Sequence, residues 1–110
     1  KRYLDIAKIT KAKVAVITDN DGDCQKKCIE KYEEYKTDNN IGVFYGEDNL
    51  KSTFEYYLFD ENELTCENEF GEDALNYMLN HKTEIALKLS YLSGLKTPNY
   101  IKRAIEWINK

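Results

Sequence analysis

The stretch from Val14 to Asp23 constrains the fold of this chain most strongly. Four aliphatic residues, Val14-Ala15-Val16-Ile17, are followed by a threonine and then by Asp19, Asp21 and Asp23. A short apolar run rich in β-branched residues predicts a buried strand of a parallel sheet that is covered on both faces. In open α/β sheets, ligands bind beyond the carboxyl ends of the strands, which is where the aspartates would lie.

Three carboxylates held this close together repel one another unless a positive charge neutralises them. A hard divalent cation prefers oxygen ligands, so the cluster of Asp19, Asp21 and Asp23 suggests a site for such an ion. Asp23 is an accessory candidate, because it could bind the ion or could instead cap the helix expected after it. The simpler alternative is an acidic, solvated turn that follows a strand.

The spacing of apolar residues predicts alternating helices and strands in the first half of the chain. Helices are expected over residues 1–10 and 24–36, and strands over 14–18 and 41–45. A strand, a helix and a second strand within about 30 residues form the βαβ unit of a parallel sheet. The segment 53–59 fits a strand or a helix equally well.

The last third of the chain has a helical pattern. The acidic segment 60–72 is expected to be irregular, with a break at Gly71. After it, apolar residues recur with helical spacing over 74–79 and 85–92. The pair Thr97-Pro98 is typical of the start of a last helix, because proline is tolerated in the first turn.

The composition is that of an ordinary globular domain. The 110 residues suffice for one domain, in which we expect an α/β part over 1–60 and a helical part over 72–110. The longest aliphatic run has only four residues, against the ~20 that a membrane-spanning helix needs. The three cysteines suit a reducing cytosol, and Cys24 and Cys28 are expected to be buried free thiols.

The net charge of −4 argues against a general attraction for nucleic acid. It leaves a nuclease open, because metal ions bound at an acidic site can supply the local positive charge.

Several segments resemble one known family, in the same order along the chain. The run from Lys13 to Asp23 closely resembles the topoisomerase-primase (Toprim) domain of the overcoming-lysogenization-defect (OLD) family of ATP-dependent endonucleases. Residues 1–8 look like the helix that this family places before that strand, and Thr53-Phe54-Glu55 is similar to its Thr-Leu-Glu segment. Residues 77–87 resemble its Asn-Lys-Thr-Glu helix start, and residues 100–108 its closing helix.

The resemblance implies a partial Toprim, Rossmann-like parallel sheet with flanking helices and a metal-dependent cleavage of DNA phosphodiesters. Asp19, Asp21 and Glu55 would bind Mg²⁺ or Mn²⁺, and Thr53 would be an accessory residue that orders the site. Lys82 and Glu55 would be catalytic. Two metal ions ~4 Å apart can activate a water and stabilise the leaving oxygen, and a lysine neutralises charge that develops on the phosphate.

The resemblance also implies partners and a limit. DNA would be the substrate, and ATP would bind only at an upstream ABC-type ATPase domain that this chain lacks. By the same resemblance, the full-length protein could form homo-oligomers and would act in the cytoplasm, away from membranes, in phage defence. Toprim nucleases also use a glutamate from an earlier strand, so we expect this chain to be an N-terminally truncated fragment with little activity by itself.

Two alternatives stay open on the same residues. One is a HAD-like phosphohydrolase with Asp19 as nucleophile, although Asp23 stands where that family usually has threonine or valine. The other is a receiver-like or metal-binding interaction module without catalysis, since acidic strand ends serve both functions.

Overall fold

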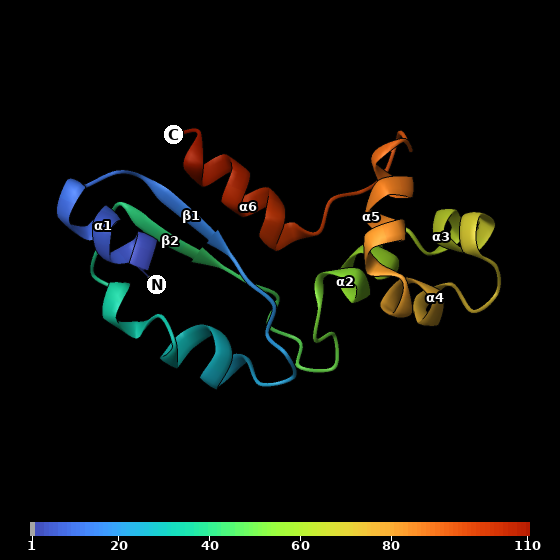
Figure 1. Cartoon of the computed structure of the whole chain (residues 1–110), viewed down its shortest axis with the longest axis horizontal. Helices are drawn as coiled ribbons and strands as arrows, with labels where there is room; N and C mark the ends of the chain where they lie inside the picture. The colour runs from blue at the N-terminus through green and yellow to red at the C-terminus, as the bar shows by residue number, and fades with distance from the viewer. Residues whose placement is uncertain (1) are drawn as a thin grey trace. The chain divides into compact units, whose positions relative to one another are not determined.

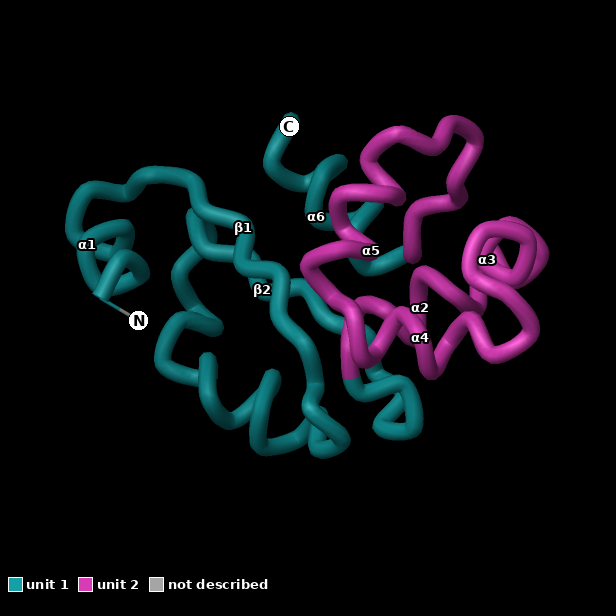
Figure 2. The backbone as a smooth tube through the Cα atoms, turned by 45° about the vertical axis from the view of Figure 1, so that its right-hand side comes forward, with its two compact units in different colours: residues 1–52, 99–110 teal, residues 53–98 magenta. Residues whose placement is uncertain are grey.

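The computed structural model describes residues 2–110, which form two compact units. Figure 2 shows unit 1, which comprises the chain up to residue 52 and residues 99–110, and unit 2, which comprises residues 53–98. This division differs from the expected one, which placed 1–60 in the α/β part and 72–110 in the helical part. The last helix belongs to unit 1, because it packs against the strands of that unit.

Unit 1 contains a two-stranded parallel sheet with helices on both sides (Figure 1). Val14 pairs with Ile41 and Ile17 with Phe44, so the two strands run in the same direction in continuous register. The predicted mixed α/β class with a parallel βαβ unit is therefore confirmed for this part of the chain. In chain order, the elements of unit 1 are α1 (Arg2–Thr10), β1 (Val14–Ile17), η1 (Gln25–Glu30), η2 (Glu33–Tyr35), β2 (Ile41–Phe44) and α6 (Asn99–Ile108).

The alternation of side chains along the strands explains why both faces of the sheet are covered. One face packs against α1 and η2 in a cluster made by Leu4, Ala7, Tyr35 and Ile41, with Val14, Val16 and Tyr32 beside it. The opposite face carries Gly42 and Phe44, and here α6 covers the sheet: the Phe44 and Trp107 rings are tilted, with centroids 5.8 Å apart. Lys13 lies over the Trp107 ring at 4.8 Å.

Two predictions about helices were wrong in detail. The single helix expected over 24–36 is a π-helical turn, η1, and a 3-10 turn, η2, separated by a turn at residues 31–32. Residues 60–72 are not irregular, because Glu63–Phe70 form the helix α3. The expected break at Gly71 is confirmed: this glycine follows α3 with φ +93°, which L-residues with a side chain rarely adopt.

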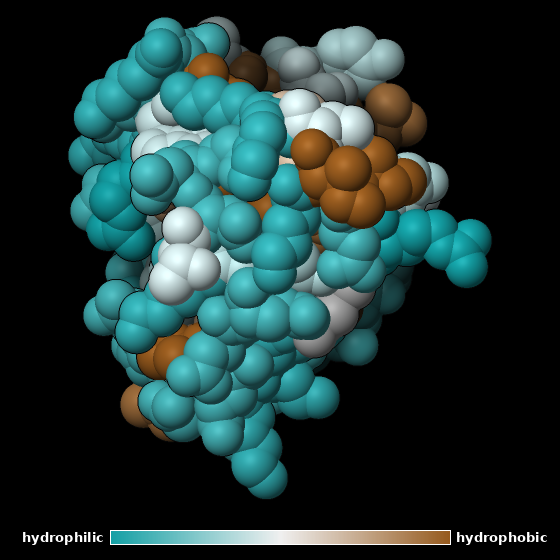
Figure 3. Space-filling view, turned by 90° about the vertical axis from the view of Figure 1, so that its left-hand side faces the viewer, coloured by the Kyte–Doolittle hydropathy of each residue, from teal (hydrophilic) through white to brown (hydrophobic). Residues whose placement is uncertain are grey.

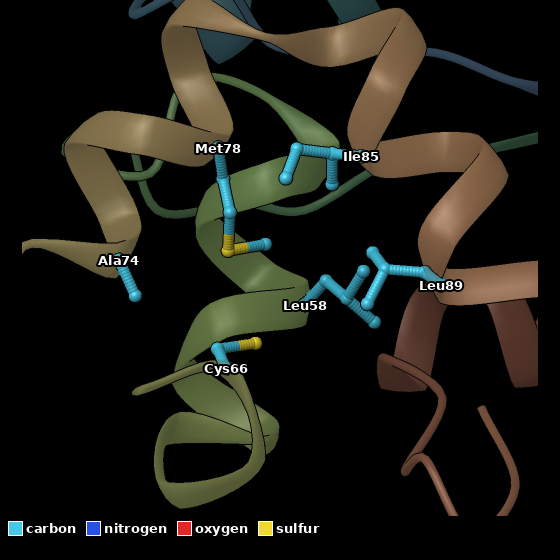
Figure 4. Close-up of a cluster of buried hydrophobic side chains, with 6 residues drawn as sticks. All are labelled: Leu58, Cys66, Ala74, Met78, Ile85 and Leu89. Carbon is cyan, nitrogen blue, oxygen red and sulfur yellow. The ribbon is translucent and has the colours of Figure 1, made fainter. Parts of the chain in front are cut away.

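Unit 2 is helical and has a hydrophobic core of its own. It contains α2 (Phe54–Glu61), α3 (Glu63–Phe70), α4 (Ala74–Asn80) and α5 (Lys82–Ser90), so the ambiguous segment 53–59 is helical. Figure 4 shows its core side chains, which come from all four helices: Leu58, Cys66, Ala74, Met78, Ile85 and Leu89. Buried Asn62 donates to the carbonyls of Leu58 and Lys96, and its own side-chain oxygen accepts the Lys96 N–H.

Much of the surface is hydrophilic, and Figure 3 shows one face on which small hydrophobic patches interrupt polar side chains. Three of the exposed apolar residues, Tyr3, Ile6 and Ile9, lie on α1. Over residues 2–110, no helix has the length and apolar character needed to cross a membrane.

Candidate functional site: an acidic turn held by a buried asparagine

The turn after β1 carries the three aspartates. Asp21 and Gly22 both have positive φ, 50° and 86°, and the Asp23 N–H donates to the Asn20 carbonyl at 2.9 Å. Positive φ at both central positions, closed by such a hydrogen bond, is the pattern of a type I′ turn, for which Asp-Gly is a preferred pair. The Asp21-Gly22 sequence therefore explains why the chain reverses here instead of entering a helix at once.

Asn20, which separates the two candidate ligands, holds this turn in place. Its side chain is only 1% exposed, and its amide nitrogen lies 2.9, 2.9 and 3.1 Å from the carbonyl oxygens of Gly46, Asp48 and Lys51. Its side-chain oxygen accepts the Gly22 N–H at 2.8 Å. All four contacts are local to the turn or to the loop after β2. A buried polar group is retained only when it is satisfied in this way, so Asn20 connects the loops that follow the two strands.

Sequence reasoning missed Asn20, because it treated the residue as a spacer between Asp19 and Asp21. The signal was present in the sequence: asparagine before Asp-Gly is typical of a turn in which the asparagine side chain bonds the backbone two residues later. Its long-range contacts with residues 46–51 could not be read from spacing.

Successive amides of the turn are already used within unit 1. The Asp21 N–H donates to the Ser52 carbonyl, and the Asp23 N–H donates to the Asn20 carbonyl. The Gly22 and Cys24 N–H groups donate to the side-chain oxygens of Asn20 and Asn49, respectively. Loops that cradle phosphate offer several free backbone N–H groups to the anion. The amides of residues 21–24 are not available for that purpose, so this part of the turn presents carboxylates and does not form an anion cradle.

Asp19 and Asp21 differ in exposure. Asp19 is half-buried, its carbonyl accepts the Cys28 thiol at 3.7 Å, and Asp21 is exposed. The Asp23 carboxylate accepts the Lys26 N–H at 3.2 Å, a contact that favours the capping alternative for this residue. The two remaining aspartates, Asp19 and Asp21, follow the end of one strand. Mg²⁺ in proteins is usually bound by one or two carboxylates, and water and substrate phosphate complete its coordination shell. The donor chemistry thus fits this ion.

Cys24 and Cys28, one helical turn apart, are buried free cysteines, as predicted. Burial and the neighbouring Cys24 raise the pKa of the Cys28 thiol to about 12. The thiol is therefore protonated near neutral pH, whereas a metal-binding cysteine is a thiolate.

The remaining candidates lie in unit 2, where the structure brings two of them together. The Lys82 Nζ lies 3.8 Å from the Glu55 Oε1, although the residues are 27 positions apart in sequence. The Glu55 side chain is only 15% exposed and that of Lys82 is 51% exposed. Thr53 directly precedes α2, and its buried hydroxyl oxygen has no hydrogen-bond partner within residues 2–110.

His81 is exposed directly before α5, and its ring stacks on Tyr77 with centroids 4.2 Å apart. Across the described part of the chain, no three His, Cys, Asp or Glu side chains are grouped so as to hold a metal ion. No protein-family model matches the sequence, and comparison with curated proteins and with solved structures finds no significant match.

Proposed function

We propose that this chain is part of the Toprim domain of an OLD-type endonuclease, and that it takes part in Mg²⁺- or Mn²⁺-dependent cleavage of DNA phosphodiesters. Asp19 and Asp21 are the metal ligands of unit 1, with Glu55 as a further carboxylate. Lys82 is the basic catalytic residue, and an upstream ATPase domain of the same protein controls access to DNA.

One observation carries the proposal: a buried side chain holds the turn that bears Asp19 and Asp21. A solvated acidic turn needs no such anchor, yet Asn20 is buried and bonded to three carbonyls across the loop after β2. Groups that act on a substrate must be held within about 0.5 Å of their working positions, and they are held by the hydrogen bonds of their neighbours. The anchoring of the turn is what such a site requires.

The contact between Glu55 and Lys82 adds support. These residues were assigned to one reaction only through the family resemblance, and α2 and α5 bring their side chains to 3.8 Å. The half-exposed ammonium of Lys82 can meet an incoming phosphate, since Glu55 offsets only part of its charge. Lys82 would then neutralise negative charge that develops on the phosphate during cleavage. When bound, the metal ion would activate the attacking water and stabilise the leaving oxygen.

The amides of the turn weigh against the HAD-like alternative. A phosphohydrolase that forms a phospho-aspartate must stabilise a transferring phosphoryl group with donors placed around the nucleophile. The N–H groups of residues 21–24, which follow Asp19, are hydrogen-bonded inside unit 1. Covalent phosphorylation of Asp19 by small phosphodonors, detected by intact-protein mass spectrometry, would favour that alternative or the receiver-like one.

The first experiment measures metal binding to the 110-residue chain. Mn²⁺ titrated into the protein should broaden the NMR signals of residues 19–23 before all others, with weak affinity. Asp19→Asn should weaken binding by at least about 10-fold. Glu30→Gln is the matched control, because Glu30 is an exposed carboxylate on the neighbouring η1. Equal loss in both variants would show nonspecific attraction to acidic surface and would contradict the proposed ligands.

The second experiment measures cleavage of supercoiled DNA by the intact protein that contains this chain. Asp19→Ala and Glu55→Ala should each lower the rate of nicking on the order of 100-fold or more, because each removes a charge that the reaction uses. Nicking at the normal rate in both variants would overturn the nuclease assignment. Strong Mg²⁺-dependent nicking by these 110 residues would contradict the expectation that the chain is nearly inactive by itself.

A further inference from the structure

A second polar feature lies at the carboxyl end of β2. A pocket of about 300 Å³ is lined by Val43, Phe44, Tyr45, Glu47 and Arg103, from the strand, from the loop after it and from α6. Because β1 and β2 are parallel and Ile17 pairs with Phe44, the chain leaves both strands at the same edge of the sheet. The Asn20 side chain reaches the Gly46 carbonyl at 2.9 Å, so the pocket and the acidic turn share this edge of unit 1.

Arg103 gives the pocket its positive charge. The residue is exposed on α6, and no ion pair to its guanidinium is seen within residues 2–110. A guanidinium offers several N–H donors in a planar fork that matches two oxygens of a phosphate. Tyr45 also lines the pocket and carries a phenolic O–H, and burial raises the pKa of this phenol.

Glu47 limits which anion the pocket can accept. Its carboxylate lies in the same lining as Arg103, so the two side chains contribute nearly balanced charge. A dianion such as a phosphate monoester would be repelled by Glu47 more strongly than a monoanion. A phosphodiester carries a single negative charge and presents two unesterified oxygens to the guanidinium fork. The lining therefore favours a diester over a monoester.

We propose that this pocket is a phosphodiester subsite, in which Arg103 binds one phosphate of a nucleic-acid strand next to the phosphate held at the aspartates. The inference deepens the proposed nuclease function and rests on it for the identity of the strand. Contacts to phosphates that do not react fix the position and direction of a strand without reading its sequence. Arg103 would thus be a positioning residue for the substrate.

The test is an NMR titration of the isotopically labelled 110-residue chain with the dinucleotide thymidylyl-thymidine, which has one phosphodiester and no terminal phosphate. The buffer contains EDTA, so no metal ion contributes. The Arg103 side-chain N–H and the Tyr45 amide should shift together and saturate. Arg103→Gln should weaken binding by at least about 10-fold, while Lys102→Gln, its exposed neighbour on α6, should change it by less than about twofold.

Two further variants separate this subsite from the metal site. Asp19→Asn should weaken Mn²⁺ binding by at least about 10-fold but change dinucleotide binding in EDTA by less than about twofold, so either site can fail without the other. Glu47→Gln should strengthen binding of inorganic phosphate more than binding of the dinucleotide, because it removes the charge that repels a dianion. Unchanged dinucleotide affinity in Arg103→Gln, or equal losses in Arg103→Gln and Lys102→Gln, would overturn the subsite.

Discussion

At the scale of single residues, Asn20 contributes most to the geometry of the acidic turn. Asn20→Ala would remove the amide that donates to the carbonyls of Gly46, Asp48 and Lys51, of which the Gly46 contact is buried and the other two are partly buried. The Asp48 carbonyl would keep the Lys51 N–H as a donor. We expect it to lower the free energy of unfolding by about 1–3 kcal/mol, since one buried carbonyl loses this donor and two partly buried contacts are lost with it. Urea denaturation measures the change. Asn39→Ala is the control, because Asn39 is exposed, and it should cost less than about 0.5 kcal/mol.

A second residue-scale prediction concerns alkaline pH and Cys28. Its pKa in the folded chain is about 12, against an ordinary value of 9.0. The unfolded chain therefore loses this proton first, and stability that is fully present below pH 9.0 declines as the pH rises toward about 12. The midpoint of urea denaturation should fall as the pH rises across this window, and the midpoint of the Cys28→Ala variant should fall less steeply. Identical pH profiles for the two proteins would contradict the assignment.

Tyr35 adds to the same alkaline decline. Its hydroxyl donates to the Asp5 carboxylate at 2.6 Å, and this hydrogen bond together with burial raises the pKa of the phenol. The Cys28→Ala variant should therefore still lose some stability at alkaline pH. The double variant Cys28→Ala/Tyr35→Phe should lose less, as measured by the urea midpoint.

At the scale of elements, the contact between α6 and the sheet depends on the absence of a side chain at Gly42. An added Cβ would lie 2.9 Å from an atom of the Phe44 ring and 3.2 Å from the Trp107 indole. Gly42→Ala should therefore destabilise the chain by about 1–3 kcal/mol and change the fluorescence of Trp107, because the rings must move. In a chain that already carries Phe44→Leu, Gly42→Ala should lower the free energy of unfolding by at least about 0.5 kcal/mol less than it does in the wild-type chain. Equal costs in both backgrounds would exclude the ring contact as the cause.

Helical spacing predicted the existence of elements better than their type. The apolar residues Cys28, Tyr32 and Tyr35 do face the sheet side of unit 1, but the backbone that carries them changes from a π-helical to a 3-10 turn. For α6 the predicted type is confirmed, but its apolar side is only partly covered: Tyr100 and Ala104 are buried while Ile105 and Ile108 remain exposed. A two-stranded sheet is too narrow to cover the whole apolar side of a helix, and sequence periodicity carries no information about that width.

At the scale of the whole molecule, the two units have separate hydrophobic clusters. Met78 is fully buried in the core of unit 2, so Met78→Ala should lower the free energy of unfolding of this unit by about 2–5 kcal/mol. Hydrogen exchange should show loss of protection in α2 to α5, with smaller losses in β1 and β2. Leu87→Ala, at a residue that is 60% exposed, is the control and should leave exchange nearly unchanged. A uniform loss of protection across both units would show that they unfold as one.

The sequence by itself determined the local features of this protein. The β-branched run Val14 to Ile17 specified a parallel strand, although this strand is only partly buried and not fully buried as expected, because a sheet of two strands is narrow. Asp21-Gly22 specified a tight turn with positive φ, and the cysteines were correctly expected to be buried. These features depend on residue type and short spacing, which act through backbone sterics and local burial. The candidate ligands Asp19 and Asp21 were visible for the same reason, and their function stays a prediction.

Only the tertiary structure decided what depends on contacts between distant segments. It packed α6 against the sheet although the residues of unit 2 separate them in sequence, and it brought Lys82 to Glu55. It also showed that Asn20 holds the turn by long-range hydrogen bonds. It also placed Arg103 in a pocket beside Tyr45 and Glu47. Such contacts follow from how chain segments pack to bury apolar surface while satisfying polar groups, and that outcome is set by the whole fold instead of by any local pattern.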